Sequence, residues 1–202
     1  MNLIGELHDL ILSSTNTVVF TGAGVSTASG IRDFRGKNGI YNDTFHGYRV
    51  EELFGIDLFN SDPSLFYAWA KDFVYDLEAF QPCTVHNVLA RLERSGLVKA
   101  VVTQNIDRLH TLAGSRNVLE VHGSPTWHHC QRCGAKMSYD EVVPIVHAGE
   151  VPMCSCGGVF KPDIVFYGEN LPEAVFSQAV RALNYIQTVI SKRLGRNWCK
   201  VG

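Results

Sequence analysis

The sequence has 202 residues, of which 46% are hydrophobic and 19% are charged, and its formal net charge is −2. This length and composition fit one globular domain, or one domain with a small insert, and exclude a fibre and a disordered protein. The balanced charge gives no support for direct nucleic-acid binding, and the apolar runs are too short to span a membrane. The N-terminal segment lacks a basic start and is interrupted by Glu6, His8 and Asp9. We therefore expect no signal peptide and a cytoplasmic location.

The first elements predicted along the chain are a helix, a buried strand and a glycine-rich turn. Apolar residues at helical spacing predict an amphipathic helix over 3–13, and the run TVVFT predicts a buried parallel strand over 17–21. GAGVSTASG follows at once, with Gly22, Gly24 and Gly30. Such a turn between a strand and a helix is typical of a nucleotide-binding βα unit, although the spacing differs from the strict dinucleotide fingerprint. The alternative is a tight turn without a ligand.

The next elements alternate between helix and strand. Residues 36–80 are rich in aromatic side chains, most of which we interpret as core. There, SDPSLFYAWAKDF begins with a capping residue, Ser61 or Asp62, and an early proline, which predicts a helix. TVHNVLARLERS predicts a second helix that ends at Gly96, and KAVVTQ and NVLEVHGS predict two further strands. This alternation indicates an α/β fold with a parallel sheet.

Four of the six cysteines form two close pairs. Cys130 and Cys133 make a C-x2-C pair, and Cys154 and Cys156 make a C-x-C pair after 20 intervening residues. Zn²⁺ prefers four tetrahedral thiolates, and two pairs on tight, glycine-containing turns supply them with little loss of chain entropy. Four protein ligands leave no open position, so we expect a structural zinc ion. Chance clustering of buried thiols is the alternative.

Polar side chains follow several of the predicted strands, which is where ligands bind in an open parallel sheet. Gln104, Asn105 and Asp107 follow KAVV and are placed to contact a ribose or an amide. His122 follows VLEV and precedes a glycine, a position that suits a general base. In IRDFRG, the arginines can pair with phosphates or fix the loop through Asp33, and the aromatic ring can stack on a ligand. Each residue also has a simpler interpretation as a polar loop residue.

Together these segments resemble the sirtuins, the NAD-dependent protein-lysine deacylases. The matching motifs are GAGVSTASGIRDFRG, TQNIDRLH, VHGS, the four cysteines and KPDIVFYGENLP, in the family's order. The resemblance implies a Rossmann-like NAD-binding domain with an inserted small domain that has two modules. The implied ranges are 1–36, 81–124 and 161–202 for the NAD-binding domain, 37–80 for a helical module and 125–160 for a zinc-binding module.

The resemblance also implies roles for individual residues. The implied catalytic residues are His122 as the base, together with Asn105 and Asp107. The implied NAD-binding residues are Gly22, Ala23, Gly24, Ser26, Thr27, Asp33, Phe34, Arg35, Gln104, Asn105, Ile106, Asp107 and His122. The implied substrate-binding residues are Phe34, Phe54, Val165, Tyr167, Gly168 and Glu169, the last two on an edge that pairs with the substrate backbone.

The implied reaction transfers the acyl group of acyl-lysine to ADP-ribose, with NAD as cosubstrate, release of nicotinamide and one structural Zn²⁺ per chain. The implied partners are acetylated proteins or peptides. Tyr48 and Arg49 are adjacent, unlike the Tyr-x-x-Arg pair of sirtuins that prefer acidic acyl groups, so we expect acetyl or neutral acyl substrates. Two alternatives are an inactive, zinc-containing module that binds acyl-lysine or NAD, and ADP-ribosyl transfer in the same pocket.

The resemblance weakens after Ala179. The family continues there into a buried strand that ends in a Gly-Thr-Ser turn, whereas this chain reads VRALNYIQTVISKRLGRNWCKVG and has no such turn. Residues 174–202 carry five basic side chains and no acidic one. We therefore expect the last strand–helix units to be missing, with part of the adenosine side of the NAD site, and an exposed edge of the sheet.

Overall fold

A computed structural model describes residues 3–184 and 188–191 of the chain. Within these residues, none of the helices is both long enough and apolar enough to cross a membrane. The chain forms two compact units, each assembled from separate segments of the sequence. Unit 1 comprises Met1–Ile31, Gln81–Val121 and Pro172–Gly202, and unit 2 comprises Arg32–Phe80 and His122–Leu171.

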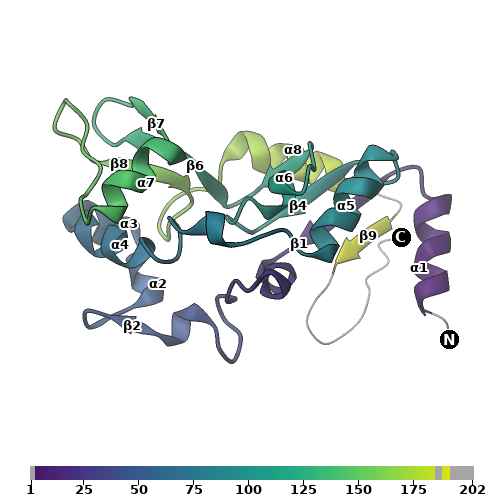
Figure 1. The fold of residues 1–202 in the computed structure, drawn as a ribbon. Coiled ribbons are helices and arrows are strands. Elements are labelled where there is room, and N and C mark those ends of the chain that lie inside the picture. Colours follow the sequence, from purple (N-terminus) through teal and green to yellow (C-terminus); the bar gives the residue numbers. More distant parts are fainter. Residues whose placement is uncertain (1–2, 185–187, 192–202) are drawn as a thin grey trace. The chain divides into compact units, whose positions relative to one another are not determined.

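Unit 1 is built on a four-stranded parallel sheet with the order β5-β4-β1-β9 (Figure 1). Its strands are β1 (Thr17–Thr21), β4 (Ala100–Thr103), β5 (Val118–Glu120) and β9 (Thr188–Ser191). All four residues of β4 are buried, and four of the five in β1. Strands that are covered on both faces lack the alternation of apolar and polar residues, which is why TVVFT and AVVT read as continuous apolar runs. The predicted parallel α/β sheet is thus confirmed.

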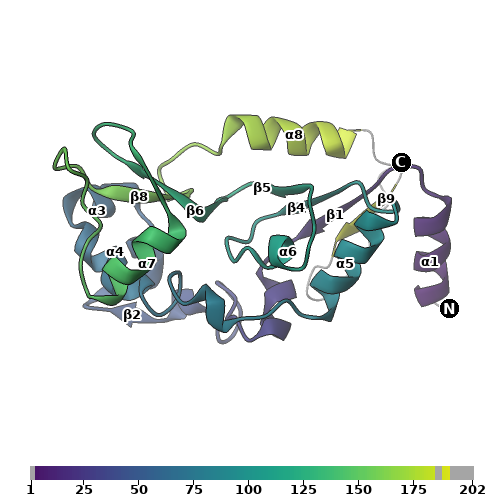
Figure 2. The ribbon, with the colours of Figure 1, turned by 45° about the horizontal axis from the view of Figure 1, so that its top comes forward.

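Helices cover both faces of this sheet (Figure 2). On one face, Val18 and Val102 pack with Ala179 of α8 (Glu173–Asn184). On the other face, Val19 and Val101 pack with Leu89 of α5 (Thr84–Arg94). Neighbouring strand residues contact opposite helices because successive side chains in a strand point to opposite faces.

The remaining elements of unit 1 follow most of the predictions. The N-terminal helix is α1 (Leu3–Ser13), and the short α6 (Leu109–Leu112) follows β4. The helix expected after the glycine-rich turn is a 3₁₀ helix, η1 (Ala23–Ser29), closed by Gly30 at a φ of 92°. A helix often ends at a residue with left-handed backbone, and glycine adopts that conformation most easily, which explains why η1 stops at Gly30.

The expectation that the last strand–helix units are missing is wrong for the strand. After α8, β9 pairs in parallel with β1, with Thr188 opposite Thr17. The sequence TVIS has the β-branched character of a strand, so it pairs with β1 although the Gly-Thr-Ser turn of the family is absent. The rest of that expectation concerns residues beyond Ser191, which lie outside the described part of the chain.

Unit 2 begins with a helical part that is rich in aromatic residues. Its elements are η2 (Ile40–Asn42), β2 (Thr44–Phe45), β3 (Tyr48–Arg49), α2 (Val50–Leu53), α3 (Ile56–Ser61), α4 (Pro63–Ala70) and η3 (Leu77–Ala79). The predicted helix start is confirmed at α4, where the Asp62 carboxylate accepts a hydrogen bond from the Ser64 N–H (3.1 Å). Proline is tolerated at the first helical position because the N–H group that it lacks would have no partner within the helix there.

The second part of unit 2 is a three-stranded antiparallel sheet with the order β7-β6-β8. Its elements are β6 (Gly123–Cys130), β7 (Lys136–Ser138), α7 (Tyr139–His147) and β8 (Phe160–Ile164). Buried polar contacts join it to the helical part: Tyr75 Oη lies 2.7 Å from His128 Nε2, and Tyr67 Oη donates to the Phe160 carbonyl. Burial lowers the pKa of His128 to about 3, so this imidazole is neutral.

Candidate functional site

The glycine-rich turn of unit 1 lies beside the segment that follows β4. The Val25 N–H donates to the Gly22 carbonyl (3.0 Å), and Thr27 Oγ1 donates to the Gly24 carbonyl (3.0 Å). The nearest atom to a Cβ built on Gly22 is Gln104 Oε1, at 3.8 Å. Neighbouring parallel strands end at the same edge of a sheet, so the structure brings together two segments that the sequence separates by about 80 residues.

Ser26 connects the turn to the polar residues after β4. Its buried Oγ donates to Asp107 Oδ2 (2.5 Å) and accepts a hydrogen bond from Asn105 Nδ2 (3.0 Å). The other carboxylate oxygen of Asp107 accepts from the Leu109 N–H (2.9 Å). Buried polar groups of this kind are stable only when they are hydrogen-bonded, so the cluster fixes the directions of the Asn105 amide and the Asp107 carboxylate.

A second buried polar chain lies behind this cluster, and the sequence analysis did not identify it. The Asn105 N–H donates to Thr103 Oγ1 (3.1 Å), and Thr21 Oγ1 donates to the same oxygen (2.8 Å). His110 Nε2 lies 2.9 Å from Thr21 Oγ1, and its ring contacts that of His86. Burial, and then the neighbouring His86, lower the pKa of His110 to about 4. The sequence signal for this polar chain was a threonine at the end of each of two predicted strands, Thr21 and Thr103.

In unit 2, the loop that contains IRDFRG is fixed by its own charged residues. The Asp33 carboxylate accepts from the Gly36 N–H (3.1 Å), and the Arg32 guanidinium donates to both carboxylate oxygens of Asp43 (2.6 and 3.1 Å). The paired guanidinium lowers the pKa of the Asp43 carboxyl. Of the two roles predicted for these arginines, Arg32 therefore fulfils the loop-fixing one, but its carboxylate partner is Asp43 and not Asp33 as expected.

Arg35, the second arginine of this loop, contacts a residue of the candidate substrate edge. Its Nη2 donates to Tyr167 Oη (2.7 Å) and to Glu51 Oε1 (3.3 Å). Its guanidinium also lies 5.3 Å from the centre of the Tyr41 ring. Burial raises the pKa of Tyr41, and the hydrogen bond with Tyr167 adds to the increase. The structure thus joins a predicted NAD-binding residue to a predicted substrate-binding residue within one unit.

Phe34 and Phe54 belong to a group of aromatic side chains in unit 2. Their ring centres lie 6.3 Å apart, edge to face, and Phe34 also contacts Tyr41 at 5.2 Å. Phe54 is only 4% exposed and packs on Trp69 and Phe166. The substrate-binding role that the resemblance implies for Phe54 therefore falls on a ring that is part of the aromatic core, whereas Phe34 is half-buried.

The candidate base, His122, immediately precedes β6. Its carbonyl oxygen accepts a hydrogen bond from the Val165 N–H (2.9 Å), a residue of the candidate substrate edge. Gly123, which follows it, has a φ of 72°, and a Cβ built there would overlap the Asp163 carbonyl. Only glycine fits this position, so any side chain here would displace the backbone next to His122.

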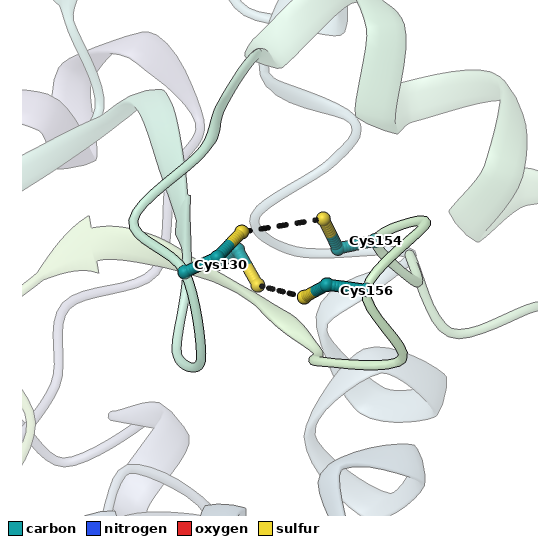
Figure 3. Close-up of side chains that lie close together, drawn as sticks. Cys130, Cys154 and Cys156 are labelled. Atoms are coloured by element: carbon teal, nitrogen blue, oxygen red, sulfur yellow. Dashed lines mark hydrogen bonds between the residues drawn. The ribbon is translucent and has the colours of Figure 1, made fainter.

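The four clustered cysteines come together at one end of the antiparallel sheet (Figure 3). Sγ of Cys130 lies 3.4 Å from that of Cys156, Sγ of Cys133 lies 3.7 Å from that of Cys154, and all four sulfurs lie within 4.8 Å of one another. Zinc–sulfur bonds of about 2.3 Å in a tetrahedron place sulfurs about 3.8 Å apart. The cluster therefore has the dimensions of a four-thiolate zinc site, as predicted.

The ionisation of these thiols also fits a metal site. Burial raises the pKa of Cys130, but the backbone N–H groups of Cys133 and Arg132 outweigh it and lower the pKa to about 6. The Gly158 N–H lowers the pKa of Cys156, but the neighbouring sulfurs outweigh it and raise the pKa to about 12. Four sulfurs this close cannot all be anionic by themselves, so a bound cation is required to hold four thiolates.

The predicted site residues fall into two groups. Unit 1 contains Gly22, Ala23, Gly24, Ser26, Thr27, Gln104, Asn105, Ile106 and Asp107. Unit 2 contains the four cysteines together with Asp33, Phe34, Arg35, Phe54, His122, Val165, Tyr167, Gly168 and Glu169. In unit 1 the structure joins Ser26, Asn105 and Asp107, and in unit 2 it joins Arg35 to Tyr167, His122 to Val165 and the four cysteines to one another. It adds Asp43, Glu51, Tyr41 and Lys161 as partners that the motifs did not indicate.

The fold and these two sites define a class of protein: an α/β nucleotide-binding protein with a separate four-cysteine zinc module. A family model described as the Sir2 family matches residues 22–193. Among curated proteins, an NAD-dependent protein deacetylase of Thermotoga maritima is 44% identical over 176 residues, which are 87% of this chain and 70% of that protein. An NAD-dependent protein deacetylase of Sulfolobus acidocaldarius is also 44% identical, over 92% of this chain and 71% of that protein.

Solved structures give the same result. A complex of Sir2, a p53 peptide and NAD⁺ superposes with a TM-score of 0.81 at 40% identity, over 92% of this chain and 73% of that one. A structure of Sir2 bound to acetylated peptide gives a TM-score of 0.80 at 37% identity, with the same coverage. The chain belongs to the Sir2 family, and the resemblance drawn from its motifs is confirmed.

Proposed function

We propose that this chain removes acetyl groups from lysine side chains in an NAD-dependent reaction that releases nicotinamide. The observation that carries the proposal is the buried Ser26–Asp107–Asn105 cluster, which presents an oriented carboxylate and amide beside the glycine-rich turn in a chain of the Sir2 family. The curated relatives are NAD-dependent protein deacetylases, and a solved relative binds a p53 peptide and NAD⁺.

The residues of unit 1 fit the polar half of NAD. The glycine-rich turn from Gly22 to Thr27 would hold the phosphates, because a backbone without large side chains lets N–H groups approach them. Asp107 accepts hydrogen bonds and Asn105 both donates and accepts, which suits the carboxamide and ribose hydroxyls next to nicotinamide. Gln104 and Ile106 complete that surface. When bound, NAD supplies the ADP-ribose that accepts the acyl group and nicotinamide as the leaving group.

The residues of unit 2 fit the substrate and the proton transfer. His122 is half-buried, and as a neutral imidazole it would remove a proton from a ribose hydroxyl. Phe34 and Arg35 would cover the cofactor, with Asp33 shaping their loop. Val165 and Tyr167 would line the path of the acyl-lysine next to Phe54, with Gly168 and Glu169 at the edge that pairs with the substrate backbone.

Zinc would act as a structural ion rather than in the reaction. Cys130, Cys133, Cys154 and Cys156 supply four sulfurs, so no coordination position is left for a water molecule or a substrate. The ion would fix the loops that carry the two cysteine pairs to the end of β6. A cytoplasmic location is part of this proposal, and it is supported by the four thiols, which a reducing compartment keeps unoxidised.

We further propose that unit 1 is the NAD-binding domain and that unit 2 contains the helical and zinc-binding modules. This assignment is supported by the glycine-rich turn in the first unit and the four cysteines in the second. Three segments that the motifs grouped with the NAD-binding domain, 32–36, 122–124 and 161–171, pack with unit 2. The second contains the candidate base, His122, and the first and third contain candidate residues that touch each other, Arg35 and Tyr167.

The experiment measures nicotinamide release from NAD in the presence and absence of an acetyl-lysine peptide. We expect release that requires the peptide and is lost in His122→Ala. Release at equal rates in wild type and His122→Ala would contradict the catalytic assignment. Peptide binding without nicotinamide would identify a binding module, and transfer of labelled ADP-ribose to protein instead of to a small acyl product would identify an ADP-ribosyl transferase.

A further inference from the structure

The candidate substrate edge, Val165–Glu169, is held at its first residues by neighbouring backbone. The Val165 N–H donates to the His122 carbonyl (2.9 Å), and the Tyr167 N–H donates to the Phe54 carbonyl (2.7 Å). The Tyr167 carbonyl in turn accepts from the Ile56 N–H (3.0 Å). These bonds hold the edge as far as Tyr167, the second residue of the turn at its end, and leave Gly168 and Glu169 to be held by other groups.

That turn spans Phe166 to Glu169. The Glu169 N–H donates to the Phe166 carbonyl (3.0 Å), and Gly168 has a φ of 94°, as the third position of a type II turn requires. A Cβ built on Gly168 would lie 2.9 Å from Ile56 Cγ2, so the turn approaches α3 closely. A four-residue turn with glycine at its third position has several accessible shapes in isolation, and a further contact is needed to select one.

Lys161 in β8 supplies that contact, and it is only 5% exposed. Its Nζ lies 2.9 Å from Glu169 Oε2 and donates to the carbonyls of Ile164 (2.8 Å) and Pro162 (3.2 Å). It also lies 4.1 Å from the centre of the Phe166 ring. An ammonium group has three donors, and all three find an acceptor here.

The Glu169 carboxylate links this buried ammonium to the turn. Its Oε2 also accepts a hydrogen bond from the Phe166 N–H (2.8 Å), so one oxygen receives both the Phe166 backbone and Lys161. Burial lowers the pKa of Lys161, and the neighbouring Glu169 opposes that change. A buried ion pair of this kind rarely adds net stability, but it does specify geometry when its partners are fully hydrogen-bonded.

We propose that Lys161 is a positioning residue for the deacylation reaction: through Glu169 it holds the Phe166–Glu169 turn in the shape that receives the acyl-lysine peptide. This inference rests on the proposed function. It also assigns the Glu169 side chain to the interior, so that the backbone of this residue, rather than its carboxylate, faces the substrate. Neither residue takes part in bond making or breaking, and the expected effect falls on peptide binding.

The test compares Lys161→Met, Glu169→Gln and the double variant with wild type and with Lys136→Met, an exposed lysine on β7 of the same unit. We expect the KM for an acetyl-lysine peptide to rise at least about tenfold in the single variants, because small displacements of a binding edge have large effects. The KM for NAD should stay within about twofold of wild type, and Lys136→Met should match wild type in both. The dissociation constant of the peptide, measured directly by calorimetry, should likewise rise in the single variants and stay at the wild-type value in Lys136→Met.

An unchanged peptide KM and dissociation constant in any folded variant would overturn the proposal, as would equal increases for peptide and NAD. Should Lys161→Met fail to fold, the double variant, which leaves no unpaired buried charge, provides the same comparison. If wild type releases no nicotinamide, the proposed function fails and calorimetry alone decides: weaker peptide binding in the variants supports the positioning role, and unchanged binding overturns it.

Discussion

Ser26 and Asp107 are separated by 81 positions in the sequence, yet their side chains form a buried hydrogen bond of 2.5 Å. The serine lies on the glycine-rich turn and the aspartate follows β4, so this bond joins the two segments that end neighbouring strands. The Asn105 amide donates to the same serine oxygen. Ser26 thus links the loop assigned to phosphate to the residues assigned to ribose and nicotinamide.

Ser26→Ala should impair NAD binding as well as lower stability. Removing the hydroxyl takes away the Ser26 partner of Asp107 Oδ2 and of Asn105 Nδ2, which costs about 1–3 kcal/mol of stability. The same loss frees both side chains to turn, so we expect the KM for NAD to rise about tenfold, equivalent to about 1.4 kcal/mol. Steady-state kinetics and thermal unfolding check the two effects separately.

Ser95→Ala is the matched control, because Ser95 is exposed in the same unit and its hydroxyl bonds only to the Leu92 carbonyl (2.9 Å) in the described contacts. It should behave as wild type in both assays. A Ser26→Ala protein with an unchanged KM for NAD would show that the cluster does not orient the cofactor.

Gly123→Ala should abolish activity and destabilise unit 2. Both Gly123 and Gly149 have left-handed backbone, with φ of 72° and 81°, so alanine at either position costs about 1 kcal/mol through the backbone alone. Only at Gly123 would the added Cβ also overlap a backbone carbonyl, that of Asp163, whereas nothing lies within 4 Å at Gly149. The clash adjoins His122 and must displace its backbone.

We therefore expect Gly149→Ala to retain wild-type kinetics with a slightly lower midpoint of thermal unfolding. Gly123→Ala should show a larger drop in that midpoint and no detectable nicotinamide release. Equal stability of the two variants would contradict the steric argument, since they differ mainly in the space available.

The zinc site predicts a stoichiometric requirement for metal. Cys133→Ser should lose the ion, because a serine hydroxyl is not a thiolate ligand at neutral pH, and the loops around Cys154 and Cys156 should then unfold. Metal analysis should give one zinc per wild-type chain and a small fraction of that in the variant. Cys83→Ser, outside the cluster, should keep its zinc; a zinc content in Cys133→Ser equal to that of wild type would exclude the four-cysteine site.

The buried histidines predict that stability falls on mild acidification. Burial lowers the pKa of His110 from 6.5 to about 4, so the unfolded chain binds a proton between these values that the folded chain does not. Stability therefore decreases as pH falls through this window, by up to about 1.4 kcal/mol per pH unit for each such group. His128, with a pKa lowered to about 3, acts in the same direction.

Thermal unfolding between pH 7.5 and 5 measures this dependence. His110→Asn should give a shallower decline than wild type, because one of the groups that become protonated on unfolding is gone. His8→Asn, in which an exposed histidine is replaced, should follow the wild-type curve. A wild-type midpoint that does not change with pH would mean that these imidazoles are protonated in the folded protein.

The sequence alone predicted the main strands and helices of unit 1, how they alternate, and which four cysteines form a cluster suited to a metal. Those properties depend on short-range patterns: apolar runs such as TVVFT, a capping residue such as Asp62, and two close pairs of cysteines. The prediction failed at the C-terminal strand, where the absence of a family motif was given more weight than the local sequence pattern. The run TVIS has the local pattern of a strand, and it forms β9 although the Gly-Thr-Ser turn is absent.

Only the tertiary structure decided which partner each polar side chain has. Ser26 bonds to Asp107, Arg32 to Asp43, and Lys161 to Glu169, and in the first case the two residues lie far apart in the chain. No local pattern encodes such pairs, since they depend on how the strands order in the sheet and where loops fold back. The same reason explains Phe54, whose burial among other aromatic rings follows from packing and not from its neighbours in the sequence.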